Sequence, residues 1–110
     1  MYAVTAKHLK SRFPNIKIGG PAFTSPWETN FKRKFLKTVK ENSIPLDFYS
    51  FHCYADTPDG ISEAAAEGYD ALKAAGLDST EIILDEWNYI KGWSGDGWKE
   101  SLDIMEISIK

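Results

Sequence analysis

The sequence contains only one cysteine, Cys53, no long apolar run and no excess of positive charge. A single cysteine excludes an internal disulfide bond and a zinc ribbon, and we expect Cys53 to be a small buried side chain. No stretch approaches the roughly 20 apolar residues that cross a bilayer, and the chain does not open on a basic region followed by an apolar segment. The sequence therefore argues against a membrane partner. It leaves the compartment open, with a reducing one such as the cytoplasm favoured.

The charge balance bears on the kind of partner. Thirteen Lys and Arg against 16 Asp and Glu give a net charge of −3, whereas a nucleic-acid partner would favour a basic face. Hydrophobic residues make up 43% and aromatic residues 14% of the 110 residues, a balance typical of a globular chain of one domain. The sequence therefore predicts no nucleic-acid partner.

Four stretches with helical periodicity alternate with three strand-like ones. The predicted helices cover 2–13, 31–39, 61–75 and 98–109, and the predicted strands cover 16–18, 48–54 and 81–86. In the second helix, apolar side chains at 31, 35, 36 and 39 form the predicted buried stripe, and the basic side chains at 32, 33, 37 and 40 are expected to face solvent. Residues 57–60 read as a turn by composition. The near-continuous apolar run 81–86 is typical of a strand buried on both faces.

The spacing of the strands bears on the fold class. The strands start at Ile16, Phe48 and Glu81, 32 and 33 residues apart. A (β/α)₈ barrel of roughly 250 residues has a period of about 31 residues. A doubly wound sheet shows the same alternation, and three strands cannot close a barrel. We therefore expect α/β structure in which residues 1–110 are one segment of a (β/α)₈ barrel. A small self-sufficient α/β domain is the alternative.

Two acids end the third predicted strand. By alternation, Glu86 follows Ile82 and Leu84 on one side of the strand, and Asp85 follows Ile83 on the other. Glu86 occupies the carboxyl end, where functional groups of barrel enzymes lie, and Trp87 and Asn88 follow it. A carboxylate there can act as a nucleophile or base, and the indole offers a flat apolar surface on which sugars stack. The structural alternative is an acid that caps a neighbouring helix or pairs with a lysine.

The ends of the other two strands carry further candidates. His52 and Tyr54 share a face and can bind sugar hydroxyls, although a core histidine beside a core tyrosine is the alternative. Gly20 permits close approach of a ligand or forms a plain turn. Trp93 and Trp27 lie in loops and could line a sugar subsite. His52 could converge with acids such as Glu86, but their spacing forms no metal-ligand motif, so we expect no metal.

Three motifs in order resemble glycoside hydrolase family 39. They are IKIGGPA at 16–22, DFYSFHCY at 47–54 and ILDEWN at 83–88. The family includes β-xylosidases and α-iduronidases, built as clan A (β/α)₈ barrels. The likeness runs from about Tyr2 to Asn88 and corresponds to the fifth, sixth and seventh strands of such a barrel.

The resemblance implies a retaining glycosidase that needs no cofactor and acts on a carbohydrate, with β-xylosides as the first substrate class. Glu86 matches the nucleophile of the seventh strand. His52 and Tyr54 match residues that line the sugar site, with Tyr54 expected to hydrogen-bond the nucleophile. The residues expected to contact substrate are His52, Tyr54, Trp87, Asn88, Gly20 and Trp93.

The resemblance also implies that one of the two catalytic carboxyl groups of the family is missing from this chain. The acid/base glutamate of the clan lies in an Asn-Glu pair at the end of the fourth strand, and no Asn-Glu pair occurs in this chain. Because retaining hydrolysis requires two carboxyl groups, we expect the chain to be inactive alone. A function of a different class is a stand-alone α/β module that binds carbohydrate or assembles with copies of itself through an exposed sheet face.

Overall fold

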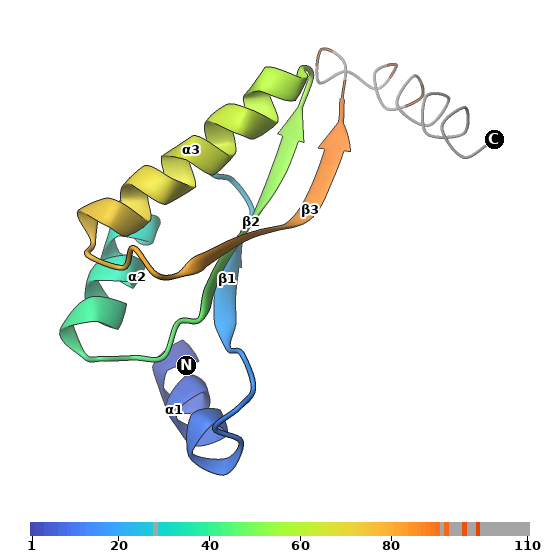
Figure 1. Cartoon of the computed structure of the whole chain (residues 1–110). Helices are drawn as coiled ribbons and strands as arrows, with labels where there is room; N and C mark the ends of the chain where they lie inside the picture. Colours follow the sequence, from blue (N-terminus) through green and yellow to red (C-terminus); the bar gives the residue numbers. More distant parts are fainter. Residues whose placement is uncertain (28, 91, 93–95, 97–98, 100–110) are drawn as a thin grey trace.

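The computed structural model describes residues 1–27, 29–90, 92, 96 and 99. In this part of the chain three helices alternate with three strands (Figure 1): α1 (Tyr2–Arg12), β1 (Gly19–Phe23), α2 (Thr29–Glu41), β2 (Phe48–Ala55), α3 (Pro58–Ala74) and β3 (Glu81–Tyr89). The predicted alternation is confirmed for these elements. The predicted helix over 98–109 lies, apart from Lys99, outside the described residues. Among the described helices, none combines the length and the apolar character that a membrane crossing requires.

The strands form one parallel sheet in the order β1-β2-β3. Helix α2 links β1 to β2, and α3 links β2 to β3. Both helices lie against the same face of the sheet (Figure 1), and α1 packs beside α2 through a cluster that includes Ala6 and Val39. The predicted α/β class with parallel strands is confirmed. The strand order never reverses along the described chain.

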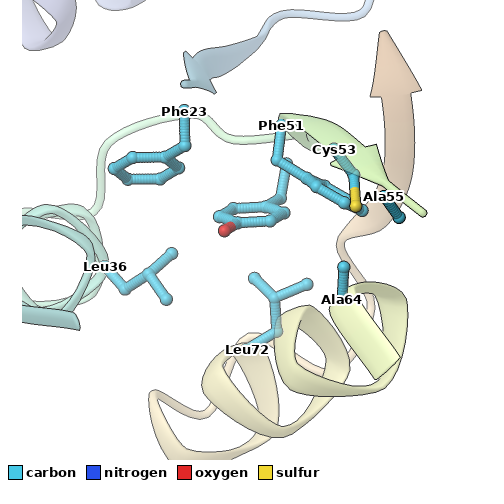
Figure 2. Packing of buried hydrophobic residues seen from close by; sticks show 8 residues of the cluster. Phe23, Leu36, Phe51, Cys53, Ala55, Ala64 and Leu72 are labelled. Carbon is cyan, nitrogen blue, oxygen red and sulfur yellow. The ribbon is translucent and has the colours of Figure 1, made fainter. Parts of the chain in front are cut away.

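The core fills the space between the sheet and the two crossover helices. Alternate residues of β2, among them Phe51 and Cys53, point toward the helices and are buried. Leu36 of α2 and Leu72 of α3 meet them from the other side (Figure 2). Cys53 is 2% exposed, which confirms the small buried side chain expected from the sequence, and burial raises the pKa of its thiol.

Asp47 ties together the amino-terminal ends of the strands. Its carboxylate accepts a hydrogen bond of 2.7 Å from the backbone N–H of Ile18, and Lys10 Nζ lies 2.9 Å from the same oxygen. These contacts, the Ile18 bond first, lower the pKa of Asp47. The backbone N–H of Glu81 donates to the carbonyl of Asp47 at 3.1 Å. One residue thus joins the segments that enter all three strands.

The first strand begins at Gly19 and not at Ile16, so its predicted start was wrong. Ile16 is 41% exposed and lies outside the sheet, whereas Gly19 pairs with Phe48. A Cβ at position 19 would lie 2.1 Å from the carbonyl oxygen of Phe48, so only glycine fits this close approach of two strands. The glycine is therefore explained by strand packing.

The predicted turn at residues 57–60 is the start of α3. Thr57 is the N-cap: its Oγ1 accepts a hydrogen bond of 3.3 Å from the backbone N–H of Gly60. Pro58 occupies the first helical position, where its missing N–H leaves no donor unpaired. Turn composition and an N-cap use the same residue types, which is why the prediction was wrong.

The basic face of α2 differs from the prediction at one position. Lys32, expected in solvent, is 2% exposed, whereas Phe31, expected in the core, is 58% exposed. The ammonium group of Lys32 contacts the carboxylate of Glu67 on α3 and donates to the carbonyl of Pro26. A buried cation with a carboxylate partner therefore joins the two helices.

The sequence predicted that the third strand is buried on both faces, and this prediction was wrong. Ile82 and Leu84 pack against the core, but Ile83 is 38% exposed. Within the described sheet β3 is an edge strand, and no described element covers its second face. The apolar run therefore has cover on one side only.

Candidate active site

The candidate residues gather at the carboxyl ends of the parallel strands, on the sheet face that α2 and α3 do not cover. Tyr49, Phe51 and Cys53 point toward the helices. Because side chains alternate along a strand, His52 and Tyr54 point to the opposite face. We call this second face the site face. His52 and Tyr54 are each half-buried there and are not core side chains.

A β-bulge brings Glu86 to the site face. Phe51 pairs with Leu84, but the next residue of β2, His52, pairs with Glu86, so Asp85 is an extra residue in β3. Tyr54 then pairs with Asn88. Strict alternation would have turned Glu86 toward the helices. The sequence patterning had grouped Glu86 with Ile82 and Leu84 on one side of the strand, and that grouping was wrong.

His52 lies between two carboxylates. Its Nε2 is 3.7 Å from Asp85 Oδ1, and its Nδ1 is 3.8 Å from Glu86 Oε2. The exposed fractions of the side chains are 20% for His52, 33% for Asp85 and 53% for Glu86. Asp85 was not among the predicted site residues, because the sequence interpretation chose Glu86, the last residue of the predicted strand. Strict alternation after Ile83 already places the Asp85 side chain on the site face.

Other predicted site residues lie away from this cluster. Gly20 pairs with Tyr49, and a Cβ added there would lie 3.9 Å from the ring of Tyr2, so the position faces α1. Trp87 pairs with Cys53, on the face that the helices cover, and is 63% exposed. Trp93 lies outside the described residues.

The cluster is an open surface. In the described part of the chain no three His, Cys, Asp or Glu side chains are arranged to hold a metal ion. A groove of about 650 Å³ is present, but it lies between α2 and α3 and is lined by Lys32, Leu36 and Glu67 among others. Both helices cover the face of the sheet toward which Phe51 and Cys53 point (Figure 1), so the groove is not part of the site face.

A parallel sheet whose strand ends carry His52, Glu86 and Asn88 is typical of α/β enzymes, in which the active-site groups follow the strands. The family model "Glycosyl hydrolases family 39" matches residues 1–87. The chain belongs to this family, and the resemblance seen in the sequence is confirmed.

Two relatives agree with this assignment. The β-xylosidase of Geobacillus stearothermophilus is 39% identical over 57 residues, which cover 49% of this chain and 10% of that protein. The crystal structure of a glucosidase from Croceicoccus marinus matches with a TM-score of 0.74 and 36% identity, over 79% of this chain and 19% of that one. The chain thus spans about a tenth and about a fifth of these relatives.

Proposed function

We propose that residues 1–110 are one segment of the (β/α)₈ catalytic barrel of a retaining glycosidase. The support is the family, the likeness to part of a glucosidase structure, and a parallel sheet with sequential strands and both crossover helices on one face. In such a barrel the helices form the outer ring and the strand ends carry the chemistry. The site face of this chain is then the face turned toward the barrel interior.

Glu86 is the proposed nucleophile. The observation that carries this assignment is the bulge in β3, which pairs Glu86 with His52 and puts both on the site face. In the first step Glu86 attacks the anomeric carbon, and the bond to the leaving oxygen breaks as the glycosyl-enzyme bond forms. Tyr54 and Asn88, paired one step farther along the strands, are the proposed sugar contacts together with His52.

We infer that the second carboxyl group of the reaction comes from outside this chain, because the chain contains no Asn-Glu pair. Retaining enzymes hold two carboxyl groups about 5–5.5 Å apart, and the second protonates the leaving oxygen and then activates water. Asp85 lies beside His52, on the same strand as Glu86, and not across a substrate from it. We therefore expect no turnover of ordinary glycosides by this chain alone. β-Xylosides are the proposed substrate class, because a β-xylosidase is among the relatives.

A glycoside whose leaving group departs without a proton tests the nucleophile. The chain is incubated with dinitrophenyl 2-deoxy-2-fluoro-β-xyloside, and the intact mass is measured. One glycosyl adduct is expected, mapping to Glu86. It is lost in Glu86→Gln and kept in Glu81→Gln, which removes an exposed carboxylate at the other end of β3. Absence of the adduct from a folded chain would overturn the claim that these residues form a working nucleophile site.

A second candidate function rests on the uncovered sheet. Ile83 is 38% exposed on the site face, and β1 and β3 each have one neighbouring strand within the described sheet. Open strand edges and apolar faces promote association. A non-catalytic module that binds carbohydrate or assembles through this face would sediment as a dimer or larger species, and Ile83→Lys would return it to a monomer.

A further inference from the structure

A small hollow lies at the carboxyl end of β1. It measures about 220 Å³ and is lined by the end of β1, the loop that follows it and the first turn of α2: Pro21, Ala22, Phe23, Thr24, Ser25 and Phe31. Phe31 is 58% exposed, and its ring meets the ring of buried Phe23 edge to face, with 5.5 Å between the ring centroids. Exposed aromatic side chains at a concave surface are typical of ligand sites.

The backbone at this hollow departs from regular strand geometry. Ala22 is the residue that the ladder between β1 and β2 skips, and its φ of 58° lies in the left-handed region, which is unfavourable for a residue with a Cβ. Its N–H donates a hydrogen bond of 3.1 Å to Oγ of Ser50, which is 2% exposed. Bulges and strained residues are common at functional sites, where they redirect the chain. A buried hydroxyl therefore holds the shape of the end of β1.

The same hydrogen bond joins the hollow to the site face. Ser50 and His52 are successive side chains of β2 on that face. Because neighbouring strands lie about 4.8 Å apart, β1 runs about 10 Å from β3, the strand that carries Glu86. The nucleophile and the leaving oxygen of a retaining glycosidase lie on opposite sides of the anomeric carbon. The leaving group therefore extends away from Glu86, and β1 is the described strand that lies farthest from Glu86.

We propose that the hollow is a subsite for a leaving-group sugar, whose ring packs on Phe31 and whose hydroxyl groups bond to Thr24 and Ser25. The C–H groups on one face of a pyranose ring match an aromatic side chain. The Ser25 oxygen accepts from the backbone N–H of Trp27 at 3.3 Å, and its O–H is a donor for the ligand. The substrate class is then a disaccharide or a longer oligosaccharide, whose leaving group is itself a sugar ring. This inference rests on the proposed function and assigns Phe31 to specificity, with no part in bond breaking.

Titration of the full chain with xylobiose, followed by ¹H–¹⁵N correlation spectra, tests the inference without activity. We expect saturable shifts of the backbone amides of Ala22, Thr24 and Ser25. Because the side chain of Phe31 is exposed, Phe31→Ala should fold, and it should weaken binding about two- to tenfold, the loss expected for one aromatic contact. Phe31→Trp, which keeps an aromatic face, should keep the binding. Phe13→Ala removes an aromatic side chain of similar exposure, 56%, at the end of α1 and should leave the binding unchanged.

Xylitol, an open chain that has hydroxyl groups but no ring face, separates a sugar subsite from general contact with polyols. It should cause no saturable shift at the hollow, and shifts equal to those with xylobiose would overturn the inference. So would the absence of saturable shifts in the folded chain, or equal binding by folded Phe31→Ala. Labelling of Glu86 is read separately. Labelling without binding at the hollow overturns this inference alone, whereas binding at the hollow without labelling refutes the proposed nucleophile and supports the hollow as a sugar site.

Discussion

The two partners of the ion pair between α2 and α3, Lys32 and Glu67, should differ in how much their replacement destabilises the fold. Lys32 is 2% exposed, whereas Glu67 is 31% exposed. When Glu67→Gln removes the carboxylate, the ammonium group cannot move into water and keeps the carbonyl of Pro26 as a partner. When Lys32→Met removes the cation, water can still reach the carboxylate, and the methionine fills the space of the lysine stem. We therefore expect Glu67→Gln to destabilise the fold more than Lys32→Met does.

The magnitudes follow from the burial of each partner. Breaking a buried pair costs about 3–5 kcal/mol, and we expect about 3 kcal/mol for Glu67→Gln because one partner is partly hydrated. For Lys32→Met we expect about 1 kcal/mol. The double variant should lie within about 1 kcal/mol of the unmodified chain, because apolar replacement of both charges is often neutral. The coupling between the two sites is then about 3–5 kcal/mol.

Urea denaturation followed by far-ultraviolet circular dichroism measures these differences. With a slope of about 1–3 kcal/mol per molar urea, Glu67→Gln should lower the midpoint by about 1–3 M. The exposed pair of Lys37 and Glu41, 3.7 Å apart on α2, is the matched control. Glu41→Gln should cost no more than about 0.5 kcal/mol. Equal costs for the two single variants, with an additive double variant, would refute the reasoning.

Three further predictions concern tyrosines and an aspartate. Among the described residues the buried Tyr49 hydroxyl has no hydrogen-bond partner, whereas the Tyr2 hydroxyl donates to Pro45 at 2.8 Å. In urea denaturation Tyr49→Phe should therefore be neutral or stabilising by up to about 1 kcal/mol, and Tyr2→Phe should cost about 1 kcal/mol; a reversed order contradicts this. Burial raises the pKa of Tyr2 from 10.0 to about 12, so the advantage of the unmodified chain over Tyr2→Phe should be complete below pH 10 and disappear as the pH rises through 12. The contacts of Asp47 lower its pKa from 3.8. The unmodified chain should therefore be more stable than Asp47→Asn above pH 3.8, and this difference in stability should decline in an acid titration as the pH falls through the lower pKa of the folded state. A difference that persists in acid argues against the Asp47 contacts.

Element order and strand direction were accessible from the sequence because they depend on periodicity and spacing. The apolar stripe of α2 predicted Leu36 and Val39 correctly, and both are 2% exposed. The same stripe misplaced Lys32 and Phe31, because a lysine whose charge meets a carboxylate on another helix can occupy a core position. The partner, Glu67, is 35 residues away in the sequence, and no local pattern reports it.

The candidate site was predicted less completely than the fold. His52 and Glu86 lie in the carboxyl-terminal halves of β2 and β3, as the sequence indicates, although β3 continues to Tyr89, beyond its predicted end at Glu86. Their common face does not follow from the sequence, because it depends on the single extra residue, Asp85, in the ladder. The register of a bulge is set by pairing between strands, and strict alternation along one strand gives the opposite answer.

Both edge strands depart from regular pairing at the same height in the sheet. The ladder between β1 and β2 skips Ala22 just before Phe51, and the ladder between β2 and β3 skips Asp85 just after it. Below Phe51 every position of β3 is matched, residue for residue, to β2. Above it each outer strand has absorbed one additional residue without disturbing the pairs beneath. The sheet therefore has a lower half in regular register and an upper half in which the register of each outer strand is shifted by one residue. Insertions and deletions at Ala22 and Asp85 offer a way to re-aim strand-end side chains while the lower half of the sheet stays in register.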